Sequence, residues 1–404
     1  METTAYYAFG LPLFAALIAF EAWLARRRGR SILSLADSVG NTSAGLGSIT
    51  VGLALGPVLL ALYHWAYLVF AAVEWAAGAW QPWLLALVLT DLGHYCHHRF
   101  DHRVAACWAV HGVHHQPEEL NFTTGMRHAW FSDLYSFPFY FVLPLVGVPV
   151  GHFFVATTLL SLHALMTHSQ EIDFPSFGIL VTPKSHALHH AKNPRYVDKN
   201  LGAMFCVWDK LFGTHVRLDP DDPPVYGAHS GYKTHDGVLS QWVLWGDLLH
   251  LARSTSSWRD RLRVFVKRPG WCPPGVTPAP IRRPPVSESL STRLKLYVLG
   301  QFALTCVLSL YVFILRDQHS ALFLALCAVF IFASLSSLGG LLDTRPHARL
   351  VESIRVGVGV IALLGITWTA LHSPRSAETL TADVSELAAA HRLDVQGPVP
   401  GTPA

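Results

Sequence analysis

Long apolar runs constrain the fold of this chain more than any other feature of its sequence. Each has the composition of a membrane span, which needs about 20 mostly apolar residues when it is helical. In lipid, the backbone must satisfy its hydrogen bonds within helices or closed barrels, so the runs predict an all-α integral membrane protein. The predicted spans are residues 5–25, 44–73, 80–97, 131–147, 150–167, 294–315, 319–342 and 350–371.

The composition agrees with a membrane protein. Only 14% of the 404 residues are charged, whereas a soluble domain carries about 25%. The net charge of +3 is too small to indicate a nucleic-acid partner. The six cysteines are scattered without a CxxC motif, which indicates neither a disulfide framework nor a zinc knuckle.

Basic residues set the predicted orientation of the spans. The segment RRRGR (26–30) follows the first run, which is typical of an anchor with a cytoplasmic C-terminal end and not of a cleaved signal peptide. Counting spans from there brings the run 80–97 back to the cytoplasmic side. The runs 131–147 and 150–167 then leave and return, either as two spans or as a hairpin that dips into the membrane. The segments that follow these runs are therefore expected to meet at the cytoplasmic face.

Three histidine motifs follow these spans: HRFDH (98–102), HGVHH (111–115) and HALHH (186–190). Residues three and four apart share one face of a helix, so each motif directs its imidazoles the same way. A tetrahedral metal takes four ligands, so eight imidazoles indicate two metal ions. Imidazole alone does not choose among Zn, Cu, Fe and Ni. A ninth ligand is expected at the cytoplasmic end of the fifth run. The predicted ligands are His98, His102, His111, His114, His115, His168, His186, His189 and His190.

Polar residues near the motifs are expected to orient the imidazoles by hydrogen bonding to their free N–H groups. Arg127 is expected to meet either a lipid phosphate or an acid near the site, and Glu21 to lie near the membrane interface. Three further histidines, His94, His97 and His128, receive no assigned role. The candidates for orienting the imidazoles are Asp91, Asp101, Glu118, Asn121, Asp198, Asn200 and Asp209.

The order of these motifs resembles the fatty acid hydroxylase/sterol desaturase superfamily, and most of all its alkylglycerol monooxygenase branch. The resemblance extends over roughly residues 10–215. It implies that the nine histidines hold two iron ions in a membrane non-haem di-iron enzyme. The strings that carry it are DLGHYCHHRFDH (91–102), WAVHGVHHQPEELNFTTGMR (108–127) and TPKSHALHHAKNPRYVDKNLGAMFCVWDKLFGT (182–214).

The resemblance also implies an activity. It is that of an O2-dependent monooxygenase that hydroxylates a lipid drawn from the bilayer, with cleavage of alkylglycerol ether bonds as one expectation. Electrons would come from outside the chain, from tetrahydrobiopterin or from a ferredoxin or cytochrome b5-type protein. The alternatives left open are a desaturase or hydroxylase of a sterol, fatty acid, carotenoid or other lipid, a membrane metal transporter, and a histidine-rich protein without metal.

Four regions are expected along the chain. They are a histidine-box hydroxylase domain at 1–215, a cytoplasmic segment with a Pro-rich linker at 216–292, transmembrane helices at 293–372, and a disordered tail at 373–404. The Ala-rich, Lys-poor spans favour a bacterial inner membrane over an endoplasmic reticulum.

Overall fold

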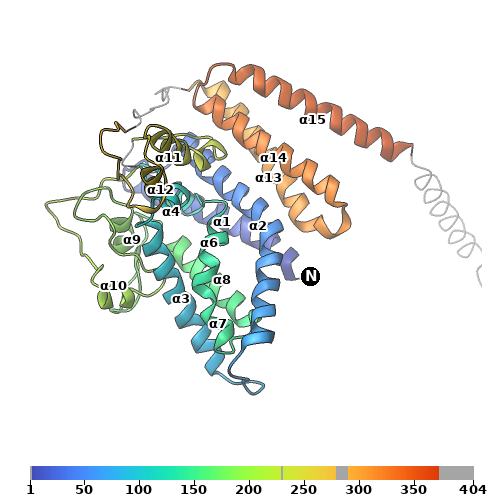
Figure 1. Ribbon diagram of the computed structural model, residues 1–404. Helices are drawn as coiled ribbons and strands as arrows, with labels where there is room; N and C mark the ends of the chain where they lie inside the picture. Colours follow the sequence, from blue (N-terminus) through green and yellow to red (C-terminus); the bar gives the residue numbers. More distant parts are fainter. Residues whose placement is uncertain (1, 229–230, 279–289, 373–404) are drawn as a thin grey trace, which may run out of the picture. The chain divides into compact units, whose positions relative to one another are not determined.

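The computed structural model describes residues 2–228, 231–278 and 290–372. Every regular element in these residues is a helix, and their one strand-like pairing is an isolated bridge between Leu180 and Phe205. The predicted all-α class is therefore confirmed (Figure 1). The chain divides into two compact units, Met1–Ala348 and Arg349–Ala404.

Among the described residues, four helices are long and apolar enough to cross a membrane, which is the mark of an integral membrane protein. They are α2 (Leu35–Phe70), α13 (Thr292–Leu315, continued by η3, Arg316–Gln318), α14 (Ala321–Leu342) and α15 (Ala348–Leu371). Three other predicted spans also form helices but are not among these four. They are α1 (Glu2–Arg27), α3 (Gln81–Asp101) and α8 (Val150–Met166). Helix α3 has a polar C-terminal half, and α8 has 17 residues, about 26 Å of helix.

Helix α3 packs on α8, and α8 in turn contacts α2 (Figure 1). The ring of Tyr63 on α2 stacks on Phe153 of α8 with centroids 4.6 Å apart, and its hydroxyl donates a 2.9 Å hydrogen bond to the Val148 carbonyl. This packing fixes how α8 lies against α2. The core between these helices contains Tyr63, Ala86, Phe137, Leu143, Val148, Phe153 and Ala156.

The hairpin of α13 and α14 packs on the N-terminal half of α2. A segment before α11, residues 231–240, crosses α14 at Gly339. A Cβ atom at Gly339 would lie 2.3 Å from the Cα of Asp236, so only glycine allows this approach. The contacts come from Val39 and Leu46 of α2, Val298, Val312 and Phe313 of α13, and Ile331, Leu335, Leu338, Leu341 and Leu342 of α14.

Helix α2 begins nine residues before the predicted span 44–73 and ends at Phe70. Ser34 caps it by accepting a hydrogen bond from the Asp37 N–H. The polar residues of its first turns find partners inside the protein, as when the Asn41 side chain donates to Thr123 Oγ1 at 3.1 Å. A hydropathy pattern excludes such residues from a span, so the helix extends beyond the predicted start of the span.

The run 131–147, predicted as a span or as part of a hairpin that dips into the membrane, is not one continuous helix. The segment forms three short helices, α6 (Ser132–Ser136), η1 (Phe137–Tyr140) and α7 (Val142–Leu145). Pro138 and Pro144 lie inside it, and proline lacks the N–H that an extended helix would need at these positions.

Short helices and loops carry most of the remaining polar residues. Of the segment 216–292, predicted to contain a Pro-rich linker, residues 229–230 and 279–289 lie outside the described residues, as does the predicted tail at 373–404. The short helices are α4 (Ala105–His111), α5 (Phe122–Gly125), α9 (Pro183–His189), α10 (Val207–Leu211), η2 (Leu239–Gln241), α11 (Val243–Arg253) and α12 (Trp258–Val266).

A buried ionic network ties the segment before η2 to α14 and α2. The Arg345 guanidinium lies 2.8 Å from carboxylate oxygens of both Asp236 and Asp343. His235 lies between two acids, with Nδ1 2.9 Å from Asp343 Oδ1 and Nε2 3.4 Å from Asp37 Oδ1. The network therefore links the start of α2 with the end of α14.

We predict that His235 makes the stability of the fold pH-dependent. Burial opposes its protonated form, but its hydrogen bonds to Asp343 and Asp37 outweigh burial and raise its pKa above 6.5. The stabilisation is complete below about pH 6.5 and is lost as the pH rises through the raised pKa. His235→Asn should lower stability by about 2 kcal/mol at pH 6 and flatten this pH dependence. Thermal unfolding in detergent measures it, with the exposed His250→Asn as control; equal pH profiles for both variants would contradict the prediction.

Candidate metal centre

Four segments carry the predicted ligands to one end of the α3–α8 pair. His98 lies in the last turn of α3, and His102 is its C-cap. The end of α4 and the turn after it carry the second motif, and α9 with its C-cap carries the third. His168 follows the C-cap of α8.

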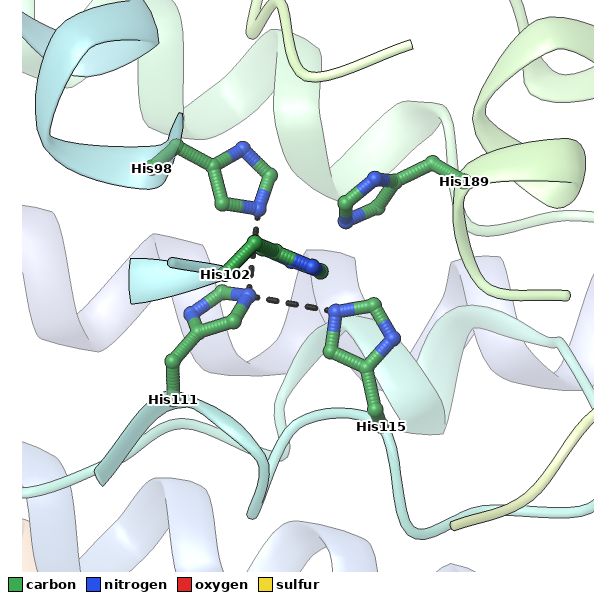
Figure 2. Close-up of side chains that lie close together, drawn as sticks. All are labelled: His98, His102, His111, His115 and His189. Atoms are coloured by element: carbon green, nitrogen blue, oxygen red, sulfur yellow. Dashed lines mark hydrogen bonds between the residues drawn. The ribbon is translucent and has the colours of Figure 1, made fainter. Parts of the chain in front are cut away.

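The nine histidines gather into two groups, with the ligand-capable ring nitrogens of each group within 4.8 Å of one another. Figure 2 shows the rings of the first group directed toward a common centre. All nine are buried except His111, which is partly exposed. The groups adjoin, because the rings of His115 and His190 lie 4.6 Å apart. The pentahistidine group is His98, His102, His111, His115 and His189, and the tetrahistidine group is His114, His168, His186 and His190.

The second and third motifs, HGVHH and HALHH, are each divided between the two groups. In the second motif, His111 and His115 belong to the pentahistidine group, whereas His114 belongs to the other. The third motif is divided the opposite way, since His189 alone joins the pentahistidine group. Residues four apart lie on one stripe of a helix and the residue at the third position is displaced around it. The two motifs therefore interlock, and neither group is complete without both.

Ring nitrogens of the pentahistidine group lie at the separation that a shared metal ion imposes. Two nitrogens that are each about 2.1 Å from one ion lie roughly 3.0–3.4 Å apart at octahedral or tetrahedral angles. The Nε2 atom of His111 lies 3.1 Å from Nε2 of His98 and of His115. The buried Nε2 atoms of His102 and His189 have no hydrogen-bond partner among the described residues. These donors fit a metal ion.

The tetrahistidine group has the same geometry. The Nε2 atom of His168 lies 3.1 Å from Nε2 of His114 and of His190, and 3.0 Å from Nε2 of His186. Four imidazole nitrogens converging at this spacing also fit one metal ion, with imidazole favouring zinc, copper, iron or nickel.

Backbone carbonyls orient four of the rings. A ring whose Nδ1–H donates a hydrogen bond presents the Nε2 lone pair on its other side, which is the form that a metal ligand needs. Each carbonyl therefore aims one Nε2 atom into its group. The hydrogen bonds run from His98 to Leu201, His114 to Arg127, His168 to Ala164 and His189 to Lys199, at 2.6–3.0 Å.

The turn at 198–202 supplies two of these carbonyls. Asp198 and Asn200 have φ angles of 59° and 51°, in the left-handed region that Asp and Asn adopt more readily than most residues. The Asp209 carboxylate accepts hydrogen bonds from the N–H groups of Leu201 and Gly202, at 2.7 and 2.9 Å. Asp209 thus holds the peptide whose carbonyl orients His98.

Burial keeps the imidazoles neutral. It lowers the pKa of His111, His115 and His189 well below the ordinary value, and neighbouring histidines lower it further. Burial also lowers the pKa of His168 to about 3. Neutral imidazole is the form that binds a metal.

A cavity of about 480 Å³ reaches both groups. Its lining includes Leu59 and Leu60 of α2 and Phe153, Phe154 and Leu160 of α8. A volume of this size lies in the range of small-molecule sites. An apolar molecule can therefore lie with one end beside the histidines.

Comparisons with known proteins agree with the histidine geometry. The family model described as fatty acid hydroxylase matches residues 83–214. Alkylglycerol monooxygenase of Danio rerio is 30% identical over 374 residues, which are 88% of this chain and 81% of that protein. The chain belongs to the fatty acid hydroxylase family. The family predicted from the sequence is confirmed, and so is the prediction that the protein is an oxidoreductase.

Other relatives carry related names. Alkylglycerol monooxygenase of Homo sapiens is 29% identical to this fatty acid hydroxylase family member over 372 residues, with 88% of this chain and 81% of that protein covered. The ornithine lipid hydroxylase of Rhizobium tropici is 26% identical over 214 residues, which are 50% of this chain and 63% of that protein. No solved structure matches the chain.

Two of the seven residues expected to orient imidazoles in this fatty acid hydroxylase face the nine histidines. Asp198 Oδ1 lies 3.6 Å from His102 Nδ1, and Asp101 Oδ2 lies 3.7 Å from His111 Nδ1. The other five make no hydrogen bond to any of the nine histidines, so a direct role for them was wrong. Asp91, Asn200 and Asp209 hold loops around the site, Asn121 caps α5, and Glu118 pairs with Lys233.

Arg127 and Glu21 are both buried inside the protein. Arg127 is 3% exposed and forms no ion pair with a carboxylate of the described residues; it donates instead to neutral oxygens, such as the Val113 carbonyl at 2.9 Å. Glu21 is fully buried and accepts hydrogen bonds from the Phe122 N–H and the Ser169 hydroxyl. Both residues brace the segments that carry the second motif and His168.

The three unassigned histidines line the cavity. His97 lies 3.3 Å from His94 and 3.3 Å from Asp101 Oδ2. His128 stacks on His114 with ring centroids 5.6 Å apart. His94 and His97 form a further HxxHH spacing with His98, in HYCHH (94–98), and this signal was missed. His128 has no such signal and is only a polar residue near the motifs.

We predict that Asp209→Asn weakens metal binding without unfolding the protein. The amide cannot accept hydrogen bonds at both of its ends, so the Leu201 carbonyl and the His98 ring lose their fixed position. Loss of such a supporting group typically costs about 10- to 100-fold in metal affinity. Iron titration followed by metal analysis measures it, with Asp219→Asn, which removes a carboxylate paired with Arg195, as control. Equal iron affinity in the two variants would show that Asp209 does not position the ligands.

Proposed function

We propose that this protein is a membrane-bound non-haem di-iron monooxygenase that hydroxylates a lipid with O2. One observation carries the proposal: two interlocked all-histidine groups lie at one end of a cavity whose remaining wall includes apolar side chains of α2 and α8. Family membership supports the same reading, because relatives over most of the chain are named monooxygenases.

The pentahistidine and tetrahistidine groups would each hold one iron ion. Iron bound there would supply the activation of O2 with which a C–H bond is oxidised. The chain's own residues keep the ligands neutral, fix the Nε2 atoms by the carbonyl hydrogen bonds, and enclose the site among buried side chains that exclude water. Because imidazole brings no negative charge, the ions would stay electron-poor, which suits oxidation of a C–H bond.

The reaction needs electrons from outside the chain. Hydroxylation converts R–H, O2, two electrons and two protons into R–OH and water, so a two-electron donor must act in every turnover. Tetrahydrobiopterin is the donor that the resemblance to the alkylglycerol monooxygenase branch supports; a ferredoxin or cytochrome b5-type protein is the alternative.

An alkylglycerol is the leading substrate. Hydroxylation of the carbon beside the ether oxygen gives a hemiacetal, which breaks into an aldehyde and a free glycerol. The names of two relatives whose alignments cover 88% of this chain support this substrate. The ornithine lipid hydroxylase relative supports a second candidate, hydroxylation of another lipid without bond cleavage.

We place the site at the cytoplasmic face, in a bacterial inner membrane. The basic segment at 26–30 supports the cytoplasmic side. Both histidine groups gather at one end of α3 and α8, whereas a metal transporter would need ligands along a path through several spans.

We predict that each group can be emptied separately. His189→Ala removes a ligand only from the pentahistidine group, and His186→Ala only from the tetrahistidine group. Each variant should fall from about two iron ions per chain to about one, and both should lose the oxygenated lipid. Metal analysis and lipid mass spectrometry measure this.

The control is His319→Ala, which removes a half-buried histidine that contacts Tyr311 and belongs to neither histidine group. It should keep both iron and product. Full iron content in His189→Ala, or product formation by it, would overturn the proposed site.

A further inference from the structure

The cavity is amphipathic along its length. Apolar side chains of α2 and α8, such as Leu59, Leu60 and Phe154, form one part of the wall. Ser132, Asp133 and Ser136 of α6 form another, together with polar residues of α3. A lipid chain matches the first part, and a polar group of the lipid must lie against the second.

The charges of the polar part are one-sided. Among the described residues that line the cavity there are two carboxylates, Asp101 and Asp133, and there is no lysine or arginine. The Asp101 side chain is buried and faces His97 and His111. Asp133 is exposed, and no hydrogen bond or ion pair joins its carboxylate to another described residue. Its carboxylate is therefore the negative charge that a substrate in the cavity can meet.

Asp133 also lies on the metal side of the cavity. It interacts electrostatically with His128, whose ring stacks on that of His114 with centroids 5.6 Å apart. A lipid group bound at Asp133 would hold the adjoining chain beside the tetrahistidine group.

We propose that Asp133 determines substrate specificity by accepting a hydrogen bond from an O–H or N–H donor in the lipid head. The donor is a hydroxyl or an ammonium group, and a lipid with an anionic head is disfavoured at this position. This inference rests on the proposed lipid hydroxylase function. It extends that function by naming the residue that contacts the lipid head group and the kind of head group that this residue binds.

Two physical effects produce the selection. A hydrogen bond to a charged acceptor favours the donor-bearing lipid by about tenfold over one without a donor. An anionic head would place a second negative charge beside Asp133, and no lysine or arginine of the described lining is there to pair with it. The neutral hydroxyls of Ser132 and Ser136 leave this charge balance unchanged.

The test compares three probes that share one alkyl chain: 1-O-dodecylglycerol, dodecylamine and dodecanoate. Binding to the iron-loaded full chain is measured without O2, and turnover is measured with O2 and reductant. The variants are Asp133→Asn and Asp133→Lys, with Asp317→Asn as control because Asp317 is exposed and distant in sequence from the cavity lining. Iron content reports whether each variant is folded.

The wild type and Asp317→Asn should bind the glycerol or the amine probe, or both, at least about tenfold more tightly than dodecanoate. Whichever of these two probes binds more tightly identifies the hydrogen-bond donor as a hydroxyl or an ammonium group. Asp133→Asn should remove most of this preference and raise KM more than it lowers kcat, and Asp133→Lys should favour dodecanoate. A preference that is unchanged in both iron-loaded Asp133 variants overturns the inference. The Asp133 variants could lose the preference while the wild type oxidises none of the three probes. That result would sustain the role of Asp133 in binding and overturn the monooxygenase function instead.

Discussion

Hydrogen bonds from imidazole Nδ1 groups to backbone carbonyls are the interaction on which the rest of the site depends. They fix the tautomer of each ring and leave the Nε2 lone pair directed into its group. The carbonyl that orients His98 belongs to Leu201, 103 residues later in the chain, and Asp209 holds its peptide. The metal centre therefore forms only when these distant segments have folded together. Without ions, converging buried imidazole nitrogens would remain unsatisfied, which is costly in a protein interior.

The membrane helices and the polar segments share the work of positioning. Packing of Tyr63 on Phe153 sets α8 against α2, and this places an apolar wall beside the histidines. The ionic network around Asp343 joins the α13–α14 hairpin to the segment before η2. That segment also meets the site, because Arg127 donates to the Thr234 carbonyl while its own carbonyl orients His114. The family model matches residues 83–214, and elements outside this range thus support histidine ligands that lie within it.

Motif spacing was enough to select the nine histidines that the structure brings together and to predict an all-helical membrane protein. The spacing did not show that HGVHH and HALHH are each divided between the two histidine groups, because this division depends on how α4 and α9 face each other. The orienting groups were largely missed, since a backbone carbonyl such as that of Lys199 leaves no signal in side-chain identity. Hydropathy likewise excluded Asp37 and Asn41 from α2, because it does not register polar partners supplied by distant segments. Prolines at 138 and 144 were the available signal that the fourth run is not one helix.

X-ray absorption at the iron K-edge of the purified, iron-loaded protein tests the central claim most directly. The two groups contain five and four histidines, so the account predicts an iron environment dominated by imidazole nitrogen, with strong outer-shell scattering from several rings per iron. Substitution of His190 by alanine should reduce that imidazole scattering. A spectrum dominated by sulfur, or by carboxylate and water oxygen with at most a single ring per iron, would contradict it.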